Sequence, residues 1–217
     1  MEIKRLDYLR FLKDSTGKTD LVKVLTGMRR TGKTTVMLQH MGFIRSSGVP
    51  EESICYIDLD LLGEEIDSQE LKEMLQPCLG REGLHYIMID EIQDVEGWER
   101  VIAMLVARRD CDIYITGSNS KMLSSELSTK LSGRYMEVEI LPLSFKEFVE
   151  LHGGDENDRF LQYIRYGPLP SIEPDRGDRV CRAQSEGVYN TVMMKDILSH
   201  TSGNADKLRS VCRFLFS

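Results

Sequence analysis

One eight-residue segment constrains the fold of this chain more than any other part of its sequence. Residues 27–34 read Gly-Met-Arg-Arg-Thr-Gly-Lys-Thr, which fits the pattern G-x-x-x-x-G-K-[ST]. An apolar run at residues 21–26 precedes this segment, and a helical pattern follows over residues 33–46. A strand, a glycine-containing loop and a helix in this order predict a phosphate-binding loop in an α/β domain.

The residue types in this loop suit the binding of a triphosphate. The two glycines let the backbone curl so that successive N–H groups point inward, and the following helix adds its positive dipole end. Lys33 can reach the β- and γ-phosphates, and the Thr34 hydroxyl can hold a magnesium ion. Arg29 and Arg30 either add positive charge beside the phosphates or remain solvated loop residues. We predict that the nucleotide binds to Gly27, Met28, Arg29, Arg30, Thr31, Gly32, Lys33, Thr34 and Thr35.

A second cluster of candidate residues follows the apolar run at residues 86–89, which ends in Asp90 and Glu91. Ligands bind at the carboxyl ends of strands in open α/β sheets, so this pair is expected beside the loop. Asp90 would hold magnesium through water or hydroxyl, and Glu91 would polarise the water that attacks the γ-phosphate. Small-molecule kinases often lack the second acid, so the pair favours hydrolysis. The alternative is an acidic turn without a chemical role.

Apolar runs alternate with helical patterns up to Pro142, which predicts βαβ units and a mainly parallel sheet. After Pro142 the pattern is helical. We expect a core at 1–142 with an N-terminal helix at 2–13, a helical lid at 143–200, and at 201–217 the start of a domain that this chain lacks. The predicted strands are 21–26, 54–58, 86–90, 112–116 and 135–141. The other predicted helices are 33–46, 68–78, 98–109, 121–131, 144–152, 157–166, 176–200 and 206–217.

Several segments resemble one family. The run at residues 90–99, Asp-Glu-Ile-Gln-Asp-Val-Glu-Gly-Trp-Glu, resembles the acidic motif of uncharacterised bacterial and archaeal ATPases of the AAA+ superfamily. The segments at 116–123, 133–135 and 141–148 match further signatures of that family. With the phosphate loop, the resemblance covers roughly residues 21–172.

The resemblance implies an α/β P-loop NTPase fold with five strands in the order 5-1-4-3-2, sandwiched by helices and followed by a small helical lid. It implies ATP or ADP with Mg²⁺ as ligands, and Ser118 or Asn119 as the sensor of the γ-phosphate. Arg134 would be an arginine finger, acting in cis or from a neighbouring subunit of a homo-oligomer, or else a surface residue. Pro170 would lie near the adenine, or simply make a rigid connection between two helices. Relatives continue into a winged-helix segment, through which DNA or protein partners would bind.

Composition and sequence patterns narrow the possible ligands and locations of the protein. The net charge of −7 argues against a broad nucleic-acid-binding surface. No apolar run is long enough for a membrane span and no secretory signal is visible, so we expect a cytoplasmic protein without membrane contact. No guanine-recognising N-K-x-D pattern follows the fourth predicted strand, which favours ATP over GTP. Trp98 is expected to start a helix and pack on the sheet. The cysteines lack C-x-x-C spacing and read as reduced core thiols: Cys55, Cys78, Cys111, Cys181 and Cys212.

Three function classes remain from the residues alone. The first is an Mg²⁺-dependent ATPase in which hydrolysis drives a conformational change. The second is a nucleotide-gated binding switch that hydrolyses little and recruits protein or DNA. The third is a small-molecule kinase, which the acidic pair at Asp90 and Glu91 disfavours.

Overall fold

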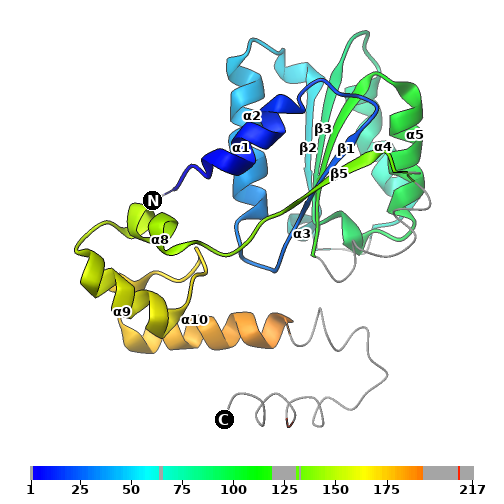
Figure 1. Cartoon of the computed structure of the whole chain (residues 1–217). Helices are drawn as coiled ribbons and strands as arrows, with labels where there is room; N and C mark the ends of the chain where they lie inside the picture. The colour runs from blue at the N-terminus through cyan, green and yellow to red at the C-terminus, as the bar shows by residue number, and fades with distance from the viewer. Residues whose placement is uncertain (1, 64–65, 119–130, 132, 193–209, 211–217) are drawn as a thin grey trace.

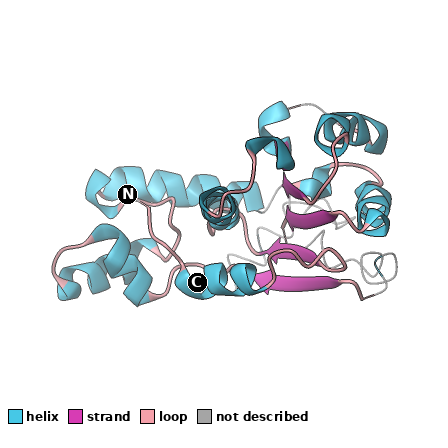
Figure 2. Ribbon diagram, turned by 90° about the horizontal axis from the view of Figure 1, so that it is seen from above, coloured by secondary structure: helices cyan, strands magenta, loops and turns pink. Residues whose placement is uncertain are grey.

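The computed structural model describes residues 2–63, 66–118, 131, 133–192 and 210, and it contains a five-stranded sheet between two helical layers (Figures 1 and 2). All four strand pairs are parallel, in the order β2-β3-β4-β1-β5. Read from the other edge, this is the predicted order 5-1-4-3-2, which is confirmed. The strands are β1 (Val22–Thr26), β2 (Ile54–Asp58), β3 (His85–Asp90), β4 (Cys111–Thr116) and β5 (Tyr135–Glu139).

The register brings the carboxyl ends of the strands to one edge of the sheet. Asp58 at the end of β2 is paired with Asp90 at the end of β3. Leu25, one residue before the end of β1, is paired with Thr116 at the end of β4. The phosphate loop leaves β1 at this same edge, as expected for ligand sites in parallel sheets.

Each face of the sheet is buried by its own pair of helices. Helices α1 (Leu6–Asp14) and α2 (Lys33–Ser46) cover one face, where residues such as Leu12, Met37 and Tyr114 form one apolar cluster. Helices α4 (Ser68–Leu79) and α5 (Trp98–Arg108) cover the other face. The short elements α3 (Leu59–Leu62), η1 (Glu51–Ser53) and η2 (Ile92–Asp94) join these units. Strands β2 and β3 read as nearly continuous apolar runs up to their last residues because both faces of the sheet are covered.

Helices follow the last strand. They are α8 (Phe145–His152), α9 (Glu156–Tyr166), the 3-10 turn η3 (Pro174–Arg176) and α10 (Asp178–Thr191). In Figure 1 they lie together beside the sheet, and the chain leaving β5 leads into them. A reciprocal capping box between Ser144 and Glu147 starts α8. No strand occurs among residues 140–192, so the helical pattern predicted after Pro142 is present over the part described.

The boundaries differ from the sequence prediction by two residues or more at three places in the described chain. The first helix begins at Leu6 rather than residue 2, because Ile3 packs against α8 instead of continuing the helix. Strand β5 ends at Glu139, two residues early. The long helix expected at 176–200 begins at Asp178 instead, because the preceding Gly177 has a φ of 89°, which is incompatible with an α-helix. The predicted helices at 121–131 and 206–217 lie outside the described residues except for their members 131 and 210, and the domain boundaries stay predictions.

The burial of Trp98 and of the cysteines can be compared with the sequence prediction. Trp98 begins α5 and is buried in the cluster with α4 and the sheet, as predicted. Of the cysteines, Cys55, Cys111 and Cys181 are buried and Cys78 is partly buried, all as free thiols, whereas Cys212 lies outside the described residues. Within the described ranges, no helix is both long enough and apolar enough to cross a bilayer.

Candidate functional site

The loop that follows β1 is fixed on both sides. Gly117 N–H donates to the carbonyl of Leu25 at 3.1 Å, and Ile140 N–H donates to the carbonyl of Thr26 at 2.7 Å. Gly27, the first loop residue, has a φ of 143°, and a Cβ there would lie 2.4 Å from the Ile140 carbonyl oxygen. Only glycine fits this position, since any side chain would overlap the backbone of the segment after β5.

Lys33 lies at the first turn of α2, and its ammonium group turns back over the loop. Its Nζ donates to the carbonyl oxygens of Gly27 at 3.2 Å and Met28 at 3.3 Å. The same Nζ lies 3.3 Å from Oε1 of Glu91 at the end of the third strand. The structure therefore brings together the loop lysine and the acidic pair, which the sequence placed on separate elements.

Asp90 is buried at the end of β3 and is held by hydroxyl groups. Burial raises the pKa of this carboxyl group above its usual range, while hydrogen bonds from Thr116 and Thr34 act to lower it. The Thr34 hydroxyl and the Asp90 carboxylate are thus adjacent. This donor set fits Mg²⁺, which proteins usually hold through one or two side chains together with phosphate oxygens and water.

Glu91 is constrained in both backbone and side chain. Its φ of 56° lies in the left-handed region, which is costly for a residue with a side chain and is found at functional sites. Its backbone N–H donates to Thr116 Oγ1 at 3.0 Å, and Gln93 Nε2 donates to its Oε2 at 2.8 Å. Arg29 Nη1 lies 3.7 Å from the same Oε2. The side chains of Lys33, Arg29 and Gln93 therefore orient this carboxylate.

Two adjoining pockets flank these residues and share Arg30, Thr34 and Glu91. The first, of about 350 Å³, lies between the loop and the helices after β5. The second, of about 340 Å³, lies on the acidic side and includes Arg29 and Asp90. Their sizes are in the range of ligand sites. Loop residues that line the first pocket are Arg30, Thr31, Gly32, Lys33, Thr34 and Thr35, whereas Met28 is exposed.

The wall of the first pocket opposite the loop comes from residues far apart in the sequence. Pro170 contributes to it, so the structure places this predicted residue at the pocket. The apolar side chains of Ile3, Leu143 and Leu151 line it as well. The segment that carries Pro170 is tied down because Leu143 N–H donates to the Pro168 carbonyl at 2.9 Å. An apolar wall facing a cationic loop suits a ligand with a flat apolar part and a phosphate chain.

The remaining predicted site residues are Ser118, Asn119 and Arg134. Ser118 is buried just beyond β4, and its Oγ has no hydrogen-bond partner in the part of the chain that is described. Asn119 lies outside the described residues. Arg134 is exposed at the amino end of β5, where its carbonyl accepts the Val22 N–H at 3.0 Å. That is the end of the sheet opposite the loop, which contradicts the cis role for Arg134. The role on a neighbouring subunit and the alternative of a surface residue both stay predictions.

Two residues that contact the acidic pair escaped the sequence prediction. Thr116 was visible as the polar last residue of a buried apolar run, one strand away from Asp90. Gln93 lies inside the acidic run already singled out, two residues after Glu91. Both belong to the candidate site because they hydrogen-bond to its carboxylates.

Sequence comparison identifies a protein family and two relatives. A protein-family profile described as an AAA domain matches residues 19–149. An uncharacterised protein of Haemophilus influenzae is 35% identical over 226 residues, covering 98% of this chain and 55% of that protein. The uncharacterised protein MJ1544 of Methanocaldococcus jannaschii is 28% identical over 212 residues, covering 90% and 46% respectively. The chain thus spans about half the length of these relatives.

Solved structures share the fold. Hsp104 of S. cerevisiae, in a complex with casein, superposes with a TM-score of 0.57 at 18% identity, over 85% of this chain and 38% of that one. ORC1 of Aeropyrum pernix, in a complex with DNA, superposes with a TM-score of 0.50 at 13% identity, over 86% and 56% respectively. At such identities the likeness shows the architecture alone.

Proposed function

We propose that this chain, which belongs to the AAA domain family, binds ATP with Mg²⁺ and hydrolyses the bond between the β- and γ-phosphates. The family match confirms the resemblance seen in the motifs. The observation that carries the proposal is the 3.3 Å approach of Lys33 Nζ to Glu91 Oε1. Lysine and acid face each other at the carboxyl edge of the sheet, which supports a triphosphate bound between them.

Each residue of the site has a chemical task in this proposal. The loop N–H groups and Lys33 bind phosphate oxygens, and the apolar wall at Ile3 and Pro170 receives the base. Thr34 and Asp90 would hold Mg²⁺, which neutralises charge on the β- and γ-oxygens when it is bound. Glu91 accepts the proton of the attacking water. Ser118, buried and without a partner in the described part of the chain, would contact the γ-phosphate.

The Lys33–Glu91 ion pair implies a change on ATP binding. Because the phosphates take over the charge of Lys33, Glu91 is freed to orient water. The helices after β5 would then close over the nucleotide and reopen after hydrolysis. Since the chain spans about half of its relatives, we place the output, whether DNA or protein binding, in the region beyond it.

The loop is tested by calorimetric titration of ATP and ADP. Lys33→Ala is expected to abolish measurable binding, because the buried ammonium is the main charge facing the phosphates. Lys18→Ala, an exposed lysine before β1, is the matched control and should bind as the unaltered chain does. Equal affinity in both variants would overturn the loop assignment.

Hydrolysis is tested separately. Glu91→Gln keeps the shape of the side chain but cannot accept a proton, so turnover should fall by roughly 100-fold or more. ATP should still bind and be retained. Glu82→Gln, at an exposed position before β3, should leave turnover unchanged. Full turnover by Glu91→Gln would remove this residue from the mechanism.

A binding switch with little hydrolysis is the second candidate. The observation that favours it is the engagement of Glu91 by Lys33, Arg29 and Gln93, which holds the carboxylate away from a water. Steady-state phosphate release with and without duplex DNA separates the two functions. Negligible release in both conditions, with nucleotide bound, would favour the switch.

Arg134 belongs to a further part of the proposal, in which the chain forms a homo-oligomer. Its exposure at the edge opposite the loop would let it reach the nucleotide of a neighbouring subunit. In that case Arg134→Ala should lower turnover without weakening nucleotide binding, and turnover of the unaltered chain should rise more than linearly with protein concentration. Linear dependence and unchanged turnover in the variant would remove this role.

A further inference from the structure

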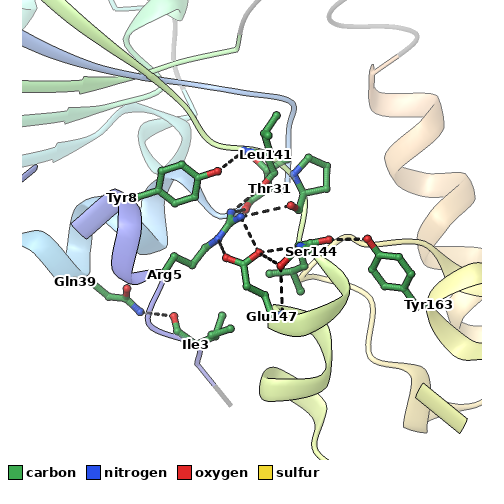
Figure 3. Close-up of polar contacts among 11 residues, drawn as sticks. Ile3, Arg5, Tyr8, Thr31, Gln39, Leu141, Ser144, Glu147 and Tyr163 are labelled. Atoms are coloured by element: carbon green, nitrogen blue, oxygen red, sulfur yellow. Dashed lines mark hydrogen bonds and ion pairs between the residues drawn. The ribbon is translucent and has the colours of Figure 1, made fainter. Parts of the chain in front are cut away.

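Arg5 is a buried arginine that contacts several separate parts of the chain (Figure 3). Only 6% of the residue is exposed. Its Nε donates to Glu147 Oε1 at 2.8 Å, and its Nη1 donates to the Leu141 carbonyl at 2.7 Å. Longer contacts of 3.4 Å run from Nη1 to the Thr31 carbonyl and from Nη2 to the Pro142 carbonyl. One guanidinium therefore uses all three of its nitrogens as donors.

One partner of Arg5, Thr31, lines the first pocket, and the others belong to α8 or to the segment that leads into it. Thr31 belongs to the phosphate loop, Leu141 and Pro142 form the connection from β5 to α8, and Glu147 lies in the first turn of α8. Arg5 itself lines the pocket beside the loop. The side chain thus joins the loop to the start of α8 at the point where the nucleotide would lie.

Apolar contacts reinforce this bridge. Ile3 forms a cluster with Leu143, Phe148 and Leu151, which belong to α8 and the segment before it. The backbone of Ile3 is anchored on the other side, because Gln39 Nε2 of α2 donates to its carbonyl at 2.8 Å. Residues 2–5 therefore connect α2, which starts at the phosphate loop, to α8 (Figure 3).

The chemistry of the contact requires an arginine. Glu147 accepts from Ser144 N–H and from Arg5, and although burial acts to raise the pKa of Glu147, the hydrogen bonds from Arg5 and Ser144 hold it below its usual value. The planar guanidinium also stacks on the Tyr8 ring, at 4.6 Å from its centroid. A lysine has the charge but not the planar fork that reaches a carboxylate and two carbonyl groups together.

We propose that Arg5 is a positioning residue that couples α8 to the phosphate loop, so that occupation of the loop by a nucleotide stabilises α8. The inference rests on the proposed nucleotide binding and deepens it. Arg5 touches no phosphate in this scheme. It transmits the position of the Thr31 carbonyl to Glu147, and the helices after β5 follow because α8 is their first element.

Amide hydrogen exchange with and without ADP tests the coupling. In the unaltered chain, ADP should slow exchange both in the first turn of α2 and in α8. In Arg5→Gln and Arg5→Lys, slowing should persist in α2 and be lost in α8. The Kd for ADP should rise roughly tenfold, because ADP binding is no longer coupled to the stabilisation of α8. Glu147→Gln should behave alike. Arg10→Gln, an exposed arginine on α1, is the control and should match the unaltered chain.

The outcomes are distinguishable. If α8 in Arg5→Gln and Arg5→Lys is slowed by ADP as in the unaltered chain, the inference is wrong while nucleotide binding stands. If the substitutions lower the melting temperature but leave the ADP effect on α8 intact, Arg5 has a purely structural role and the inference is also wrong. If Arg5→Gln does not fold, Arg5→Lys and Glu147→Gln decide by the same measurement. An unaltered chain without slowing in α2 overturns the proposed function and this inference together.

Discussion

Thr116 donates its hydroxyl hydrogen to Oδ1 of Asp90, so the last residue of β4 holds the carboxylate at the end of β3. The hydroxyl oxygen of Thr116, Oγ1, in turn accepts the backbone N–H of Glu91 at 3.0 Å. One uncharged side chain on a neighbouring strand therefore positions both acids of the candidate site.

Replacing Thr116 by Val keeps the shape of the side chain and removes both hydrogen bonds. We expect the free energy of unfolding to fall by about 2 kcal/mol, since a buried carboxylate and a buried N–H each lose a partner. Urea denaturation measures the loss, and a magnesium titration of turnover should show weaker dependence. Thr19→Val, in the turn before β1 and outside both pockets, is the control and should change stability by less than about 0.5 kcal/mol. Equal stability of the two variants would contradict the role of Thr116.

Gly27→Ala tests the close approach between the loop and the segment after β5. The added Cβ would meet the Ile140 carbonyl oxygen at 2.4 Å, so we expect a loss of about 3 kcal/mol or more together with weaker nucleotide binding. Gly48→Ala is the control. Its φ of 86° is also positive, but no atom of the described residues lies within 4 Å of the added carbon, so the loss should stay at about 1 kcal/mol. Similar losses would show that conformation, not contact, dominates at Gly27.

His40 predicts a specific pH dependence of stability. The side chain is fully buried on α2, and desolvation, with the nearby charges of Lys23 and Lys13, lowers its pKa to about 4. The unfolded chain has the ordinary value near 6.5, so it binds a proton first as the pH falls. This group's contribution is therefore complete above about pH 6.5, and up to about 3 kcal/mol is lost on the way down to pH 4.

His40→Leu should remove this dependence. The difference in unfolding free energy between the unaltered chain and the variant is measured from pH 4.5 to 7.5, which cancels the contribution of the carboxylates. The unaltered chain should lose stability relative to the variant as the pH decreases. Parallel curves for the two proteins would show that His40 titrates normally in the folded state.

Asp90→Asn should separate stability from ligand binding. Because burial raises the pKa of Asp90, its ionisation opposes folding, and stability from this group falls as the pH rises above the ordinary value of 3.8. The variant should therefore be more stable than the unaltered chain at pH 7, with the gain disappearing at low pH. Magnesium-dependent nucleotide binding should be lost. Asp14→Asn, at an exposed position on α1 that lines neither pocket, should do neither. A variant less stable at pH 7 would contradict this account.

The sheet and the main site residues were predictable because local patterns and strand ends determine them. Lys33 starts a helix after a strand, and Asp90 ends a buried strand, so a parallel sheet must bring both to one edge. Trp98 followed from its place at the start of an amphipathic helix. These are properties of short segments, which sequence periodicity records well.

The rest depended on contacts between distant segments. Arg5 and Glu147 are separated by 142 positions, and no pattern in the opening residues distinguishes a buried arginine from a solvated one. Residues 2–5 have helical spacing, but packing of Ile3 on α8 overrides that local preference. For Arg134, the motif located the residue in the chain, whereas only the strand direction shows which end of the sheet it occupies.

The carbonyl groups of Leu25 and Thr26 are bonded in opposite directions, one to Gly117 and the other to Ile140. A displacement of the end of β1 would therefore move two segments at once. One segment continues from Gly117 to Ser118, and the other runs from Ile140 through Pro142 to α8. A local movement at the triphosphate would therefore reach two separate segments. A substitution that blocks transmission to one segment would leave the other segment able to move.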